Sequence, residues 1–455
     1  MPAAAELAAT LEGLPPWRRG GYVRGCGNGV ILASGLAGHA AIGDLCLVER
    51  HPAPADAMLA APAGAMLAEV VGFSEAGVRL VPYEEPQGVT QGARVALERG
   101  LATVRPSPAW RGRVLDALAR PLDAGPPLPA GPRPYPIMAR AMPAERRHGL
   151  GPRLPLGVRA LDLFTPCCEG QRLGIFAGSG VGKSSLLSMI ARGCGADVLV
   201  IGLIGERGRE LHDFLAHTLG PEGRARSIVV VATSDMPAML RRRAAYLTLT
   251  IAEQLRDQGL SVLCLLDSVT RFAMALREIY LAAGEVPTSR GYPPGALNEL
   301  PRLLERAGPG DGSGRITGLF TVLVEGDDTN EPVSDTVRGI LDGHVLLDRA
   351  TAEGGRFPAV DVLRSLSRSA PGCYAAGEWP LVREARRLMR LHADMAELIR
   401  LGAYRAGSDP DLDRAIAVRP ALEAILQQGI GEPGGTDPMA ALKAALATPA
   451  LPAAP

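Results

Sequence analysis

Residues 173–190 read LGIFAGSGVGKSSLLSMI, and this single segment indicates the class of fold. The apolar run from Leu173 to Phe176 is typical of a buried parallel strand, and the residues after Ser184 have the spacing of a helix. Between them lies a glycine-rich turn that ends in Lys183. A strand, a glycine-rich turn and a helix in this order form a phosphate-binding P-loop.

The chemistry of this loop predicts a nucleotide and magnesium site. Its glycines let successive backbone N–H groups point into one concavity, where the positive helix end also attracts phosphate oxygens. We expect Lys183 to reach the β- and γ-phosphates of ATP as a catalytic group, and the Ser184 hydroxyl to bind Mg²⁺. Lys183 is one of only two lysines in the chain, and the usual first glycine of the motif is Ala177. The predicted nucleotide-binding set is Gly178, Ser179, Gly180, Val181, Gly182, Lys183, Ser184 and Ser185.

The segments after the loop alternate between strand and helix patterns. Apolar runs occur at 198–204, 228–231, 262–266 and 319–324, with a helix-length segment at 237–258. This alternation predicts an α/β domain built on a RecA-like parallel sheet.

The flanking regions predict two further domains. Short β-favouring runs separated by glycines predict a small N-terminal β-barrel, and a region rich in Leu, Ala, Arg and Glu predicts a C-terminal helical domain. The expected division is an N-terminal docking segment at 1–20, the barrel at 21–89, the α/β domain at 90–370, the helices at 371–430 and a tail at 431–455. The tail is expected to be disordered apart from a turn of helix around residues 439–446.

Composition excludes several classes of function. Forty-eight basic residues balance 48 acidic ones and aromatic residues make up 4%, which argues against a nucleic-acid binder. No apolar run is long enough to span a bilayer, and the first residues lack a signal peptide, so we expect a cytoplasmic protein. The seven cysteines follow no metal-binding spacing and are expected to be reduced thiols.

Two acidic residues at strand ends are candidates for the remaining chemistry. Asp267 follows an apolar strand and is expected to hold Mg²⁺, although a helix N-cap is the alternative. Glu206 lies 23 positions after Lys183, one helix and one strand further on, where it can polarise the attacking water. Arg207 would give electrostatic support to catalysis. The alternative for Glu206 is an acidic first turn of the next helix.

Several longer segments resemble the hexameric rotary-type ATPases related to the catalytic subunits of F- and V-type ATP synthases. Within that group the chain is most similar to the flagellar protein export ATPases. The resemblance covers residues 21–428, and its segments are FPAVDVLRSLSR at 357–368, LIGERGRE at 203–210, DSVTRFAMALRE at 267–278, PTSRGYPP at 287–294, TVLVEGDD at 321–328 and RGILDGH at 338–344.

The resemblance implies a homohexamer with ATP sites between subunits. Arg368 would be the arginine finger that reaches a neighbour's γ-phosphate. Phe357 would pack on the adenine ring or serve as a core aromatic, and Tyr404 is a weaker nucleotide contact. The loop 287–295 would face the central hole and touch a stalk-like coiled-coil partner, although Ala296 and Leu297 follow it where the family often has an aromatic. Other implied partners are an export regulator, the membrane export gate, chaperones and export substrates.

Four alternatives to a flagellar export ATPase remain open at this point. The closest is the injectisome ATPase of type III secretion, which shares the chemistry; a rotary ATP synthase catalytic subunit is a further option. A non-catalytic nucleotide-binding subunit would lack a carboxylate at position 206. A Rho-like RNA helicase shares the core fold, but the balanced charge and few aromatics argue against it.

Overall fold

The computed structural model describes residues 20–27, 29–51, 64–98, 102–324, 331–432 and 437–449. Nearly all of the expected docking segment 1–20 lies outside these ranges. The chain forms two compact units. The first contains the N-terminal region up to Thr103 together with residues 237–239 and 277–287, and the second contains the rest.

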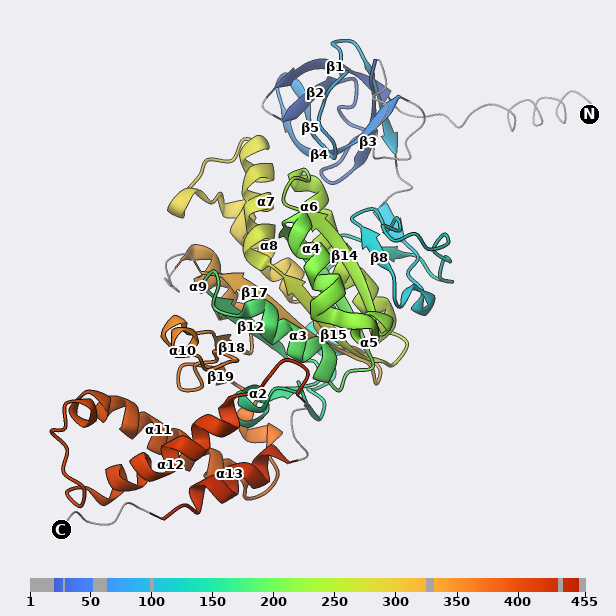
Figure 1. The fold of residues 1–455 in the computed structure, drawn as a ribbon. Helices are drawn as coiled ribbons and strands as arrows, with labels where there is room; N and C mark the ends of the chain where they lie inside the picture. Colours follow the sequence, from blue (N-terminus) through green and yellow to red (C-terminus); the bar gives the residue numbers. More distant parts are fainter. Residues whose placement is uncertain are drawn as a thin grey trace, which may run out of the picture. The chain divides into compact units, whose positions relative to one another are not determined.

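The N-terminal strands form a closed six-stranded barrel in the order β1-β2-β5-β4-β3-β6 (Figure 1). Its core is lined by fully buried aliphatic side chains such as Ile31, Val48 and Leu80. The boundary expected at residue 89 is too early, because β6 pairs with both β1 and β3 and closes the barrel. The strands are β1 (Gly20–Gly27), β2 (Val30–Ser34), β3 (Leu45–Glu49), β4 (Ala65–Ser74), β5 (Gly77–Pro82) and β6 (Arg94–Glu98).

A parallel sheet organises the second unit, in the order β19-β18-β12-β17-β15-β13-β14-β8. All neighbours on this path are parallel except β18 and β19. Its strands are β8 (Val114–Asp116), β12 (Arg172–Ala177), β13 (Val198–Glu206), β14 (Ser227–Thr233), β15 (Ser261–Asp267), β17 (Arg315–Leu323), β18 (Gly343–Leu346) and β19 (Leu366–Ser367). Five of these strands contain the predicted apolar runs, so the α/β prediction is confirmed. β16 (Gly308–Pro309) pairs with β17. Two separate two-stranded sheets are formed by β7 (Thr103–Val104) with β9 (Tyr135–Pro136) and by β10 (Arg153–Leu154) with β11 (Cys167–Cys168).

Helices connect the parallel strands, and the strand side chains are buried as a result. The helices of this region are α2 (Arg159–Phe164), α3 (Lys183–Gly193), α4 (Gly208–Asp213), α5 (Gly220–Ala225), α6 (Ala238–Arg256), α7 (Val269–Ala282), α8 (Pro294–Leu304), α9 (Pro332–Ile340) and α10 (Arg349–Glu353). No helix in the described ranges combines the length and apolar character needed to cross a membrane.

Three packed helices end the chain, drawn from orange to red in Figure 1: α11 (Glu378–Arg400), α12 (Pro410–Leu426) and α13 (Pro438–Leu446). The turn of helix expected around residues 439–446 is present as α13, within a tail otherwise expected to be poorly ordered. Leu442 is fully buried, and the Asp437 carboxylate caps the helix by accepting a hydrogen bond from the Ala440 N–H at 2.9 Å. Its apolar face is therefore part of the domain core.

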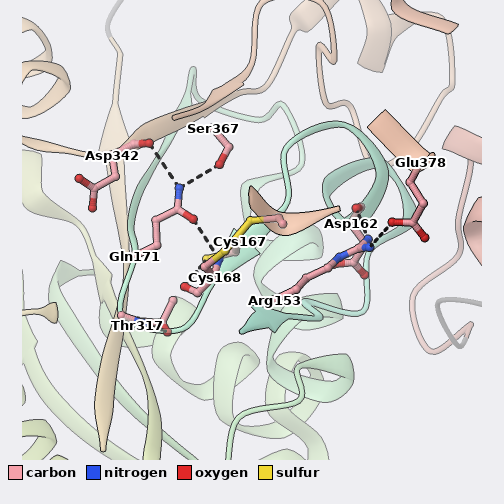
Figure 2. The surroundings of a disulfide bond; sticks show 11 residues. Arg153, Asp162, Cys167, Cys168, Gln171, Thr317, Asp342, Ser367 and Glu378 are labelled. Atoms are coloured by element: carbon pink, nitrogen blue, oxygen red, sulfur yellow. Dashed lines mark hydrogen bonds and ion pairs between the residues drawn. A yellow bond between two sulfur atoms is a disulfide. The ribbon is translucent and has the colours of Figure 1, made fainter. Parts of the chain in front are cut away.

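The cysteines also differ from expectation. Cys168 and Cys373 form a disulfide across 205 residues, which joins β11 to the short helical turn at Ala370–Cys373 (Figure 2). The prediction that all seven cysteines are free thiols is therefore wrong for this pair. The sequence gives no sign of it, because the two residues meet only in the folded chain.

Replacing Leu442 by Ala is expected to lower the free energy of unfolding by about 2–5 kcal/mol, because it leaves a cavity under α13. Urea denaturation followed by circular dichroism measures the change. Lys443→Ala on the exposed face of the same helix is the matched control. Equal stability of the two variants would show that α13 does not pack on the core.

Candidate nucleotide and catalytic site

The P-loop connects β12 to α3 in the predicted way. Between Ser179 and Ser185, no backbone N–H donates a hydrogen bond to another described residue. These unpaired donors at a helix N-terminus make a ready anion site. Gly182 has φ +99°, and a Cβ added there would lie 3.3 Å from the Phe357 ring, so only glycine fits.

The Lys183 ammonium lies between two carboxylates. It contacts Oε1 of Glu206 at 3.4 Å and makes a closer contact with Oδ1 of Asp267. Glu206 lies 23 positions after Lys183 in the chain, and Asp267 lies 84 positions after it. The predicted catalytic and metal-side groups therefore meet in one place.

The sheet topology explains this convergence. Glu206 is the last residue of β13 and Asp267 is the last residue of β15, while the P-loop follows β12. Parallel strands place their carboxyl ends at one edge, where α/β proteins bind ligands. A bulge at Gly205, which has φ +72°, turns the end of β13, and a Cβ there would lie 2.7 Å from the Arg271 side chain.

Burial and neighbouring charges shift the pKa values of Lys183 and Glu206. Burial raises the pKa of Glu206, and the adjacent Glu210 carboxyl raises it further against the opposing effect of Lys183. Burial lowers the pKa of Lys183, but Asp267 and Glu206 outweigh that effect and the pKa is raised overall. Lys183 therefore stays charged, whereas Glu206 holds a proton more readily than an ordinary glutamate.

Thr321 is a site residue that the sequence reasoning missed. It is fully buried on β17, and its hydroxyl donates to Oδ1 of Asp267 at 2.6 Å. Since Lys183 uses the same oxygen, both contacts orient the carboxylate and leave Oδ2 without a hydrogen bond among the described residues. A polar residue within the apolar strand GLFTVL was the available signal.

The residues at this edge fit a magnesium ion. Mg²⁺ prefers oxygen ligands and is commonly held by one or two protein groups together with phosphates and water. Oδ2 of Asp267 is such an oxygen, and the exposed Ser184 hydroxyl has no partner among the described residues. Both are in the set predicted for the metal.

The other predicted site residues have different surroundings. Arg207 is 77% exposed and lies 3.8 Å from Glu210, rather than against Glu206. The ring of Phe357, which is 42% exposed, lies beside Gly182 of the P-loop. Tyr404 is engaged in the helical domain, where its hydroxyl donates to Oδ1 of Asp413 at 2.8 Å.

Arg368 is exposed and lines a groove of about 600 Å³ that includes no P-loop residue. In the described part of the chain, its guanidinium makes no hydrogen bond or ion pair. The structure therefore does not bring Arg368 to the P-loop of its own chain.

The fold and this site define a P-loop ATPase of the ATP synthase type. Residues 157–367 match the ATP synthase alpha/beta family, nucleotide-binding domain, and residues 375–443 match the T3SS EscN ATPase C-terminal domain. The chain is 52% identical over 432 residues to the flagellum-specific ATP synthase of Caulobacter vibrioides, covering 93% of this chain and 94% of the relative. It therefore belongs to the family of flagellum-specific ATP synthases and type III secretion ATPases, as the motifs predicted.

The chain is also similar to type III secretion ATPases, in sequence and in structure. The type 3 secretion system ATPase of Xanthomonas euvesicatoria is 48% identical over 362 residues, covering 79% of this chain and 81% of the relative. The structure of the assembled ATPase EscN from enteropathogenic E. coli superimposes with a TM-score of 0.86 at 38% identity, covering 94% of this chain and 100% of that chain. The three-part fold prediction is thereby confirmed.

Changing Lys183 to Ala is expected to abolish nucleotide binding, whereas Glu206→Gln is expected to retain bound ATP and lose turnover. In the predicted assignment, the lysine contributes charge to binding and the carboxylate acts only on the attacking water. Fluorescent-nucleotide titration and phosphate release separate the two effects. Tight ATP binding by the Lys183 variant, or normal turnover by the Glu206 variant, contradicts the assignment.

Glu210 is expected to set the acid limb of the pH–rate profile. Glu206 must be ionised to accept a proton, so kcat should fall as the pH drops through a pKa above its ordinary value of 4.5. Glu210→Gln removes the carboxyl group that raises this pKa and should move the limb to lower pH. Glu222→Gln, an exposed acid on α5, is the control. If the acid limb of the Glu210→Gln profile does not move, Glu210 does not set the pKa of Glu206.

Proposed function

We propose that this chain is the ATPase of a flagellar type III export apparatus. It couples ATP hydrolysis, in a homohexameric ring, to the delivery and unfolding of export substrates at the export gate. The observation that carries the proposal is the meeting of Lys183, Glu206 and Asp267 beside the P-loop. A nucleotide-binding subunit without activity has no need for the carboxylate of Glu206 at this position.

The residues divide the reaction among them. The P-loop amides and Lys183 bind the phosphates, Glu206 orients and polarises the attacking water, and Phe357 packs on the adenine. Mg²⁺, held by Ser184 and Asp267, supplies charge neutralisation of the phosphates when bound. Arg207 adds positive potential at the rim of the site. Tyr404 is not included, because its hydroxyl is used within the helical domain.

Strand register supports an arginine finger that acts between subunits. Ser367 on β19 lies opposite Gly343, and His344 lies opposite Gly174 on β12. The Arg368 backbone is thus at the amino end of β12, while the P-loop begins at the carboxyl end. Six residues separate these levels, or about 20 Å at ~3.3 Å per residue, beyond the reach of one arginine side chain.

The proposed partners follow from the family. One relative has been solved in complex with its central stalk, EscO, with a TM-score of 0.83 to this chain. By analogy, a stalk-like coiled-coil protein would contact the loop 287–295 inside the ring. We further propose an export regulator, chaperones, export substrates and the export gate as partners, at the cytoplasmic face of the inner membrane, with no nucleic acid.

The alternative is the ATPase of an injectisome. Its support is the 48% identity to a type 3 secretion system ATPase over 79% of this chain. The flagellar assignment is favoured because the match to a flagellum-specific relative is both higher and longer, at 52% and 93%. A strain whose only copy is Glu206→Gln should lose filament export and motility. Loss of host-cell injection with intact motility would favour the alternative.

Mixing two inactive variants tests the shared site. Arg368→Ala keeps a working P-loop and Lys183→Ala keeps a working finger, so an equal mixture restores complete sites at about a quarter of the interfaces. Phosphate release should therefore recover to a fraction of the wild-type rate that neither variant reaches alone. If the mixture is no more active than its components, each site lies within one chain.

A further inference from the structure

Gln171 lies between β11 and β12, is fully buried (0% exposed) and uses both ends of its amide. A buried amide needs partners for its oxygen and for its NH₂ group. Oε1 accepts from the Cys168 N–H at 2.9 Å, and Nε2 donates to Oγ of Ser367 at 2.9 Å and to the backbone oxygen of Asp342 at 3.3 Å (Figure 2). The amide therefore ties the residue before Arg368 to the start of β12.

The backbone of Arg368 is held at the same place. Its N–H donates to the Asp342 backbone oxygen at 2.9 Å, the oxygen that Gln171 also contacts. Its side chain, in contrast, is exposed. The backbone of Arg368 is thus held in place, while its guanidinium is exposed.

A covalent link holds the other side of this segment. Cys373 is bonded to Cys168, whose N–H is the donor to Gln171. The segment 367–373 is consequently attached at both ends to residues 168–171. Of these attachments, the hydrogen bond from Gln171 is the one that directly contacts Ser367, the residue before Arg368.

We propose that Gln171 is a positioning residue for Arg368, and this rests on the proposed role of Arg368 as a finger between subunits. The strand β12 begins beside Gln171 and ends at the P-loop of the same subunit. One strand therefore carries a subunit's own phosphate site and anchors the finger that it offers to its neighbour. Because a misplacement of about 1 Å costs on the order of 100-fold in rate, loss of the anchor should slow hydrolysis without weakening nucleotide binding.

Gln171→Met tests this, since it keeps the length of the side chain and removes its hydrogen bonds. We expect kcat to fall about 10- to 100-fold while nucleotide affinity stays within about twofold. The matched control is Thr317→Val, at a residue close to Gln171 (Figure 2). This change removes the buried hydrogen bond that the Thr317 hydroxyl accepts from the Gly170 N–H at 3.0 Å, and that bond does not involve the segment 367–373. Ser367→Ala removes the partner hydroxyl and should reproduce the effect if the Gln171 variant fails to assemble.

A double-mutant cycle with Arg368→Ala distinguishes positioning from general stability. If Gln171 acts through Arg368, adding Gln171→Met to Arg368→Ala should lower kcat no further. In rings of wild-type subunits mixed with Lys183→Ala subunits, adding Gln171→Met to the inactive subunits should slow the wild-type sites beside them.

The outcomes separate this proposal from the one on which it rests. If Arg368→Ala keeps full turnover, Arg368 is not an arginine finger, and both proposals are overturned. If Arg368→Ala slows turnover and Gln171→Met lowers kcat by the same factor in both backgrounds, only the positioning role is overturned. The same conclusion follows if Arg368→Ala is inactive and Gln171→Met lowers kcat no more than Thr317→Val does.

Discussion

The arrangement of the site depends on one largely buried cation, the Lys183 ammonium, and on the two carboxylates that face it. Charges removed from water are tolerated only when they are paired, so the strands that carry Glu206 and Asp267 must end at the level of the P-loop. The strand order β12-β17-β15-β13 achieves this, with Thr321 on the intervening β17 orienting Asp267. In the proposed function, a bound triphosphate would replace these carboxylate oxygens around the lysine with phosphate oxygens.

The second organising feature is β12, whose two ends have different tasks. Its carboxyl end leads into the P-loop, while Gln171, beside its amino end, contacts the segment that carries Arg368. The parallel sheet keeps the two ends apart, so Arg368 does not lie at the P-loop of its own chain. This separation supports the proposal of an ATP site shared between neighbouring subunits.

The main departures from expectation come from long-range pairing. The strand β6 belongs to the barrel because two distant strands, β1 and β3, take its hydrogen bonds. The helix α13 is ordered because its apolar face fits against the other C-terminal helices. The Cys168–Cys373 bond joins residues that are 205 positions apart. The local pattern predicts a turn of helix at 439–446 but not its packing, and it carries no sign of the β6 pairing or of the disulfide.

Local pattern was enough for the strand, glycine-rich turn and helix around Lys183, because backbone freedom and apolar spacing are properties of neighbouring residues. It also singled out Glu206 and Asp267, since an acidic residue after an apolar strand is visible in the chain. Tertiary structure alone brought these carboxylates to one ammonium and gave Thr321, Gln171 and the Tyr404 hydroxyl their partners. Those outcomes depend on strand order and on burial, which bring together side chains that are far apart in the chain.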